Sequence, residues 1–161
     1  MRKAALIGSL LFGALILQVS IFPWFQFFGS IPEVVMACAI LIGIYAGPNT
    51  GAGAGFAGGL IQDLFLKSPR IGVAALAFTI VGYGAGLAER TMIRSAPWMV
   101  PAMVLGFALA GGVIQFLAGW ITGAQVSAGR VIPAAIYTAV VSIPLSPLVR
   151  RVCDLFDEAL A

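Results

Sequence analysis

The stretch GAGAGFAGGLIQD, from Gly51 to Asp63, is the part of the chain that is most informative about its fold. With the residue four positions before it, this stretch places glycine at Gly47, Gly51, Gly55 and Gly59. Residues four apart lie on one face of an α-helix. Glycine on such a face lets another backbone approach closely, which favours helix packing in a membrane. The stretch therefore predicts a membrane helix that packs closely against a neighbour, which is either another helix of the same bundle or a helix of a partner protein.

The composition of the whole chain predicts a membrane protein. Apolar residues make up 61% of its 161 residues and charged residues only 9%, whereas soluble domains carry about 25% charged residues. A membrane-spanning helix needs about 20 residues, so a small number of spans uses nearly the whole chain. We expect a single domain, an all-α integral membrane protein with about six transmembrane helices. The net charge of +3 is not concentrated in a basic run, which gives no support for nucleic-acid binding.

Polar breaks and turn residues divide the chain into six apolar segments and a tail. The predicted helices cover residues 4–22, 32–46, 51–66, 71–88, 97–121 and 130–149, and residues 150–161 form the tail. At about 1.5 Å per residue, the second and third helices each cover roughly 23 Å, less than a hydrocarbon thickness of about 30 Å. They are either two short spans, which we favour, or a re-entrant hairpin shielded by the rest of the protein.

The distribution of Lys and Arg predicts the orientation in the membrane. With the N-terminus in the cytoplasm, the cytoplasmic side carries Arg2, Lys3, Arg90, Arg94, Arg150 and Arg151. The outer side then carries Lys67, Arg70 and Arg130. Because cytoplasmic loops are enriched in Lys and Arg, we expect both termini and the tail in the cytoplasm.

In this orientation, polar residues from separate segments share the outer face of the membrane. They are Gln18, Glu33, Asp63, Lys67 and Arg70. Charges near hydrocarbon are unfavourable unless they are paired or hydrated. We therefore expect Asp63 and Glu33 to be neutralised by Lys67, Arg70 or backbone groups. The five residues are candidates for contact with a partner or a ligand, and the alternative is that they anchor the helices at the membrane interface.

The chain offers few groups for catalysis or metal binding. It contains no histidine, so an imidazole base is absent and its few carboxylates make a weak acid–base pair. The glycine stretch lacks the Lys-Ser/Thr that follows a phosphate-binding loop. Two cysteines without histidine do not make a zinc site of the usual kind. We expect a protein that is not an enzyme and has no metal or cofactor.

Several short motifs occur in an order that is typical of one family. After Gln18 come Pro32-Glu33-Val34-Val35, the pattern Gly-Phe-x-x-Gly-Leu-x-x-Asp at residues 55–63, Gly72, Ala75-Leu76, Gly82-Tyr83, and finally Pro144, Pro147, Arg150 and Arg151. From Gln18 to about Arg151, the chain resembles the rod shape-determining protein MreD family. The family more often has Asp where this chain has Glu33, a change that keeps the charge.

The resemblance implies a function in the cytoplasmic membrane of bacteria. Members of this family act in cell elongation as scaffolds or regulators and not as catalysts. The implied partners are MreC in the first place, and then the RodA glycosyltransferase, a class B penicillin-binding protein and the actin-like MreB. MreC's single helix would dock on the glycine positions or on the outer polar residues.

The resemblance also implies a helical bundle similar to the substrate-binding S components of energy-coupling-factor transporters. That similarity supplies an alternative function, a substrate-binding subunit of a vitamin-type transporter. Its pocket would be lined by Gln18, Glu33, Asp63 and Trp24.

Overall fold

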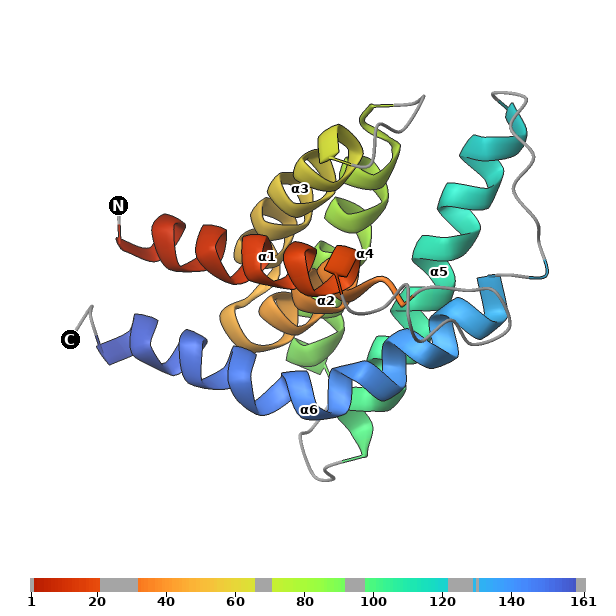
Figure 1. Cartoon of the computed structure of the whole chain (residues 1–161). Helices are drawn as coiled ribbons and strands as arrows, with labels where there is room; N and C mark the ends of the chain where they lie inside the picture. The colour runs from red at the N-terminus through yellow and green to blue at the C-terminus, as the bar shows by residue number, and fades with distance from the viewer. Residues whose placement is uncertain are drawn as a thin grey trace.

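The computed structural model describes residues 2–20, 32–65, 71–91, 98–121, 129 and 131–158. Within these residues the protein is all-helical, as predicted. The helices are α1 (Arg2–Ser20), α2 (Val34–Ala46), α3 (Pro48–Phe65), α4 (Val73–Thr91), α5 (Met99–Ile121) and α6 (Val131–Glu158) (Figure 1). Each overlaps one of the six predicted segments.

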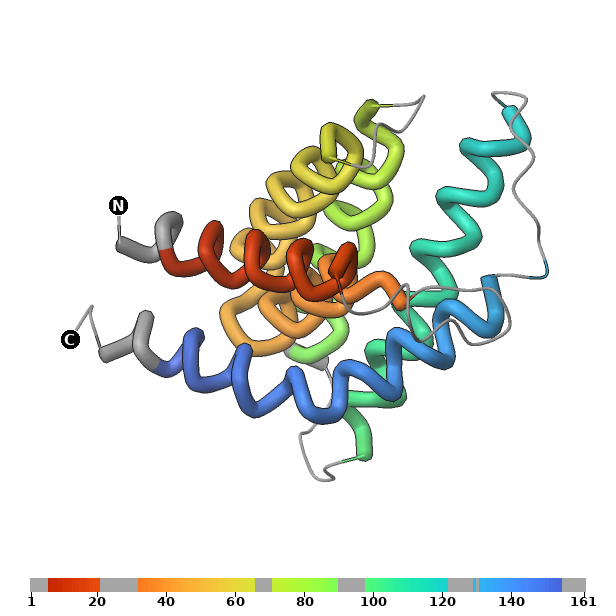
Figure 2. The backbone as a smooth tube through the Cα atoms, in the orientation of Figure 1, coloured from red at the N-terminus to blue at the C-terminus, as the bar shows by residue number. Residues whose placement is uncertain are grey.

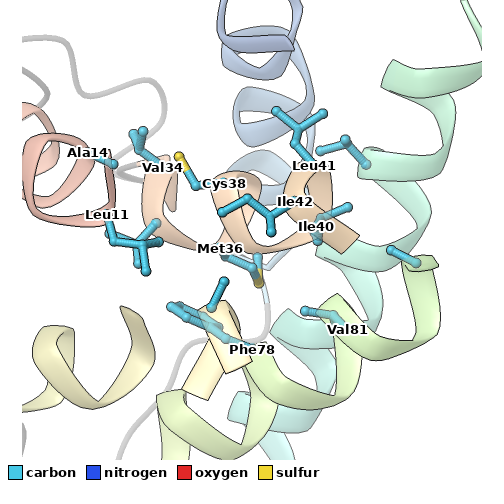
Figure 3. Close-up of a cluster of buried hydrophobic side chains, with 14 of the residues drawn as sticks. Leu11, Ala14, Val34, Met36, Cys38, Ile40, Leu41, Ile42, Phe78 and Val81 are labelled. Atoms are coloured by element: carbon cyan, nitrogen blue, oxygen red, sulfur yellow. The ribbon is translucent and has the colours of Figure 1, made fainter. Parts of the chain in front are cut away.

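Helix α2 lies at the centre of the bundle. Every residue from Val34 to Ile44 is buried, and α2 contacts each of the other five helices. Figure 3 shows the side chains of α2, including Cys38 and Ile42, surrounded by side chains from neighbouring helices such as Leu11 and Phe78. A helix that is apolar on all sides is expected to be buried on all sides. Helix α2, which is only 13 residues long, is therefore an internal helix of the bundle.

Gly47 forms the connection between α2 and α3. Its φ of +91° lies in the left-handed region, which glycine adopts without strain. Its N–H donates to the Gly43 carbonyl and its carbonyl accepts from the Gly51 N–H, both at 3.0 Å. A methyl group at Gly47 would meet nothing within 4 Å, so the prediction that Gly47 packs against a helix is wrong. The turn requires glycine at this position because of its positive φ. Helix α3 begins directly afterwards at Pro48, and proline is favoured at the first position of a helix.

The other three glycines of the series pack against α4. A methyl group at Gly51 would lie 2.6 Å from the Gly82 carbonyl oxygen, and one at Gly59 would lie 2.5 Å from the Cα of Ala75. One at Gly55 would overlap the Phe78 carbonyl. The backbones of α3 and α4 are therefore in direct contact, and this pair of helices packs more extensively than any other. Of the two predicted uses of the glycine face, the structure shows packing inside the bundle.

Helix α6 does not end at Val149 as predicted, but continues into the residues that were assigned to the tail. The helix runs through Pro144 and Pro147 as far as Glu158, and Figure 2 shows the coloured part of α6 as one continuous tube. Val149 and Cys153 are both buried. Because they are four residues apart, they extend the buried face of the helix beyond the prolines.

The outer surface of the bundle is rich in large apolar side chains. Exposed examples on four helices are Phe56, Leu76, Val113 and Ile136. Apolar surface of this extent marks contact with lipid or another protein. Helices α5 and α6 are long and apolar enough to cross a membrane. Helix α1 begins and α6 ends on the same side of the molecule (Figure 1).

Candidate functional site

Gln18 joins three helices at the N-terminal end of α2. Its side-chain Oε1 accepts a hydrogen bond from the backbone N–H of Val35 at 3.2 Å. Its Nε2 donates to Oε1 of Gln62 at 3.3 Å. The first N–H groups of a helix have no partner within the helix, so Gln18 satisfies one of them for α2. Both glutamines are buried, and their hydrogen bond connects α1 to α3.

Asp63 closes the N-terminus of α4. Its Oδ2 accepts hydrogen bonds from the backbone N–H groups of Gly72 at 2.7 Å and Ala74 at 3.1 Å. The side chain is only 4% exposed, and the partial positive charge of a helix N-terminus favours a carboxylate in this position. Of the predicted ways to neutralise Asp63, the structure shows backbone groups. Lys67 and Arg70 lie outside the described residues.

Glu33 connects the start of α2 to α5 and α6. Its two carboxylate oxygens accept from Nε2 of Gln115 at 3.1 and 2.9 Å. Its backbone N–H donates to Oγ1 of Thr138 at 3.0 Å, and the Thr138 hydroxyl donates to the carbonyl of Ala134 at 2.7 Å. The side chain of Glu33 is half-buried. In the part of the chain that the structure describes, its carboxylate makes no ion pair and depends on a neutral amide donor.

A second polar contact joins α2 and α6 at the opposite end of α2. The hydroxyl oxygens of Tyr45 and Ser146 lie 2.6 Å apart and share a hydrogen bond. Helix α6 is thus fastened to both ends of α2, by Thr138 near its own beginning and by Ser146 further along.

Three further residues supply hydrogen-bond partners for the predicted ones but were not themselves predicted: Gln62, Gln115 and Thr138. Gln115 was the most recognisable of them, because it is the only strongly polar side chain in the apolar helix α5. A polar residue inside a membrane helix generally faces a partner within the bundle. The pattern of one helix does not identify that partner.

The polar side chains at the N-terminal end of α2 connect helices to one another. We call this group, which consists of Gln18, Glu33, Gln62, Asp63, Gln115 and Thr138, the junction. Each of its carboxylates and amides named above is hydrogen-bonded to a neighbouring helix. Among the described residues, no group of three or more His, Cys, Asp or Glu side chains is placed to hold a metal ion.

A groove of about 580 Å³ lies between α4 and α5, away from the junction. It is lined by Ala88, Trp98, Met99, Ala102, Met103, Gly106, Phe107 and Ala110. None of the predicted contact residues lines it. The groove therefore differs from the pocket that the transporter alternative requires, and Trp24, which that pocket would include, lies outside the described residues.

Comparison with known proteins identifies the family. The family model described as rod shape-determining protein MreD matches residues 3–156. No curated protein and no solved structure matches the chain, so the similarity to transporter S components stays a prediction. The family match spans all the helices described above apart from the ends of α1 and α6. The chain therefore belongs to the MreD family of rod shape-determining membrane proteins.

Proposed function

We propose that this protein is a non-catalytic scaffold or regulator of the bacterial cell-elongation complex, which controls cell shape and lateral peptidoglycan synthesis together with MreC. Membership of the MreD family implies a role in rod shape determination, and the match over residues 3–156 is the observation that carries the proposal. The other proposed members of the complex are RodA, a class B penicillin-binding protein and MreB.

The use that the fold makes of its polar residues supports a scaffold. Gln18 and Asp63 are buried; Gln18 accepts from one backbone N–H at the start of α2, and Asp63 accepts from two at the start of α4. Glu33 bonds to two further helices. We propose that these residues hold the bundle together, and that contacts with partners fall on the exposed apolar faces of the outer helices. The buried glycines of α3 are already in contact with α4, which argues against MreC docking there.

For the topology we propose six membrane-spanning helices in the cytoplasmic membrane, with both termini in the cytoplasm. The exposed apolar side chains on the outer helices support contact with lipid. The positions of the start of α1 and the end of α6 on one side of the molecule agree with an even number of crossings. The excess of Lys and Arg on the proposed cytoplasmic side supports the orientation.

Depletion of the protein in its own host, followed by microscopy of cell shape and of new wall insertion, tests the proposal. We expect rounded or widened cells with scattered insertion, and rescue by the wild-type protein. Gly53→Leu should also rescue and hold MreC in co-purification, because a methyl group at Gly53 meets nothing within 4 Å. Gly55→Leu should fail, because its side chain would overlap α4.

Two results would contradict the proposal. Depleted cells that keep their shape would remove the role in elongation. If their growth were then restored by a vitamin supplement, the transporter subunit would become the better explanation.

A further inference from the structure

The glycine contacts divide the bundle into two parts with different mechanical properties. Between α2, α3 and α4, glycines contact backbone atoms of the neighbouring helix at Gly43, Gly51, Gly55, Gly59, Gly82 and Gly86. We call these three helices the glycine core. Backbone atoms in direct contact leave no room for one helix to shift against another. The glycine core is therefore expected to behave as a rigid unit.

Helix α5 is attached to the glycine core by side chains. Gly84 of α4 faces the Phe107 ring, and Gly111 of α5 faces the sulfur of Met36. Flexible side chains of this kind accommodate small shifts of a helix by changing rotamer, and methionine is especially adaptable. Gly112 of α5 faces the side chain of Val131, so α5 and the first part of α6 also pack on each other.

Helix α6 has a point of reduced stiffness beside one end of α2. Pro144 and Pro147 have no backbone N–H, so two carbonyl groups of the preceding turn lose their helical donors. Ser146, which bonds to Tyr45 at the end of α2, lies between these prolines. Beyond them, Val149 is fully buried, so the last part of the helix stays packed. The part before the prolines is buried as well, at Thr138 and Ser142, so a bend at the prolines moves that part only when these contacts open.

The groove between α4 and α5 leaves space for such a movement. Its lining from α5 includes the small residues Ala102, Gly106 and Ala110, and Ala88 lines it from α4. A methyl group at Gly106 would meet nothing within 4 Å. Phe107, which also lines the groove, already contacts Gly84 of α4, so an approach of α5 toward α4 along the groove requires a rotation of the Phe107 ring.

From these observations we propose that α5 and the part of α6 before Pro144 form an arm that pivots on the glycine core at Pro144–Pro147. The hydrogen bonds of Glu33 to Gln115 and Thr138 latch this arm at the opposite end of α2. The protein then has a latched and a released arrangement, which differ in the width of the groove. A partner that binds one arrangement more tightly shifts the population toward it. This switch goes beyond the scaffold role and does not depend on it.

Distances between spin labels in the purified protein, reconstituted in lipid nanodiscs, test the arm. The background carries Cys38→Ala and Cys153→Ala, so that only introduced cysteines are labelled. Exposed Ile80 on α4 and Val113 on α5 form the arm pair. Exposed Phe56 on α3 and the same Ile80 form the core pair.

Removal of the latch should affect the arm pair alone. Because a hydrogen bond to a charged group is strong, we expect Gln115→Leu with Thr138→Val to raise the released population about tenfold. This population appears as a second distance in the arm pair, while the core pair keeps one narrow distance. Gln18→Leu is the matched control, because it removes hydrogen bonds at the same end of the bundle that do not involve the arm. It should leave the arm pair unchanged.

A single arm-pair distance in the unlatched protein would overturn the proposal. Equal broadening of both pairs would also overturn it, because the whole bundle would then have loosened. If the double variant fails to fold, Glu33→Gln is used instead. It weakens the hydrogen bonds of the latch and keeps the size of the side chain. The arm pair in the Glu33→Gln protein must then show the second distance. Pro144→Ala with Pro147→Ala should suppress the second distance in the unlatched protein, and its persistence would refute the position of the pivot.

Discussion

Replacement of Gly55 by alanine adds one methyl group where α3 meets the backbone of α4. That methyl group would overlap the Phe78 carbonyl and lie 2.9 Å from the backbone nitrogen of Thr79. Neither backbone atom can rotate away, so α3 and α4 must separate, and overpacking of this kind costs about 1–3 kcal/mol. Alanine also improves helix propensity over glycine by about 1 kcal/mol, which partly hides the loss.

Gly53→Ala isolates the packing effect from the propensity effect. Gly53 lies in the same helix, is exposed, and has nothing within 4 Å of the added methyl group. The Gly53→Ala variant gains the same helix propensity as Gly55→Ala, but its methyl group does not overlap the backbone of α4. We therefore expect Gly55→Ala to unfold with a free energy lower by about 1–3 kcal/mol than Gly53→Ala. Reversible unfolding in mixed detergent micelles, followed by circular dichroism, measures both variants. Equal stabilities would refute the direct contact between the two backbones.

Further predictions use the same unfolding assay and concern contacts at the helix ends. Asp63→Ala should lower the free energy of unfolding by about 2–3 kcal/mol, since two N–H groups lose their charged acceptor; a loss below 0.5 kcal/mol, on the order of a surface substitution, would contradict this role. Gly72→Ala should cost about 1–2 kcal/mol because the φ of Gly72 is +107°, and an unchanged stability would show that this backbone conformation is not required. A double-mutant cycle of Tyr45→Phe and Ser146→Ala should give a coupling of about 0.5–1.5 kcal/mol, and additive losses would argue against their hydrogen bond.

Composition and turn residues were sufficient to predict the helices, because the apolar segments are separated by polar or glycine-containing breaks. The end of α6 was missed for a physical reason. The charged residues Arg150, Arg151 and Asp154 after the prolines indicated a polar tail, but the helix continues through them without a break. Val149 and Cys153 are apolar and four residues apart, and the structure shows both of them buried on the continuing helix.

The candidate site was predicted only in part, because sequence spacing shows depth in the membrane but not direction around a helix axis. Gln18, Glu33 and Asp63 could be assigned to one end of the bundle from the order of the helices. Their partners could not be assigned, since Gln115 lies 82 residues beyond Glu33. Gly47 shows a related limit: it shares the spacing of the packing glycines, yet its positive φ assigns it to a turn.

The central position of α2 has a consequence for the order in which the protein is made. A ribosome releases α2 before α3, α4, α5 and α6, four of the five helices that will enclose it. Until the last two emerge, Glu33 lacks Gln115 and Thr138, and α2 has an uncovered flank. Completion of the fold must therefore wait for the final helix of the chain. A nascent or truncated product without that helix leaves the backbone N–H of Glu33 without its Thr138 acceptor and one flank of α2 uncovered.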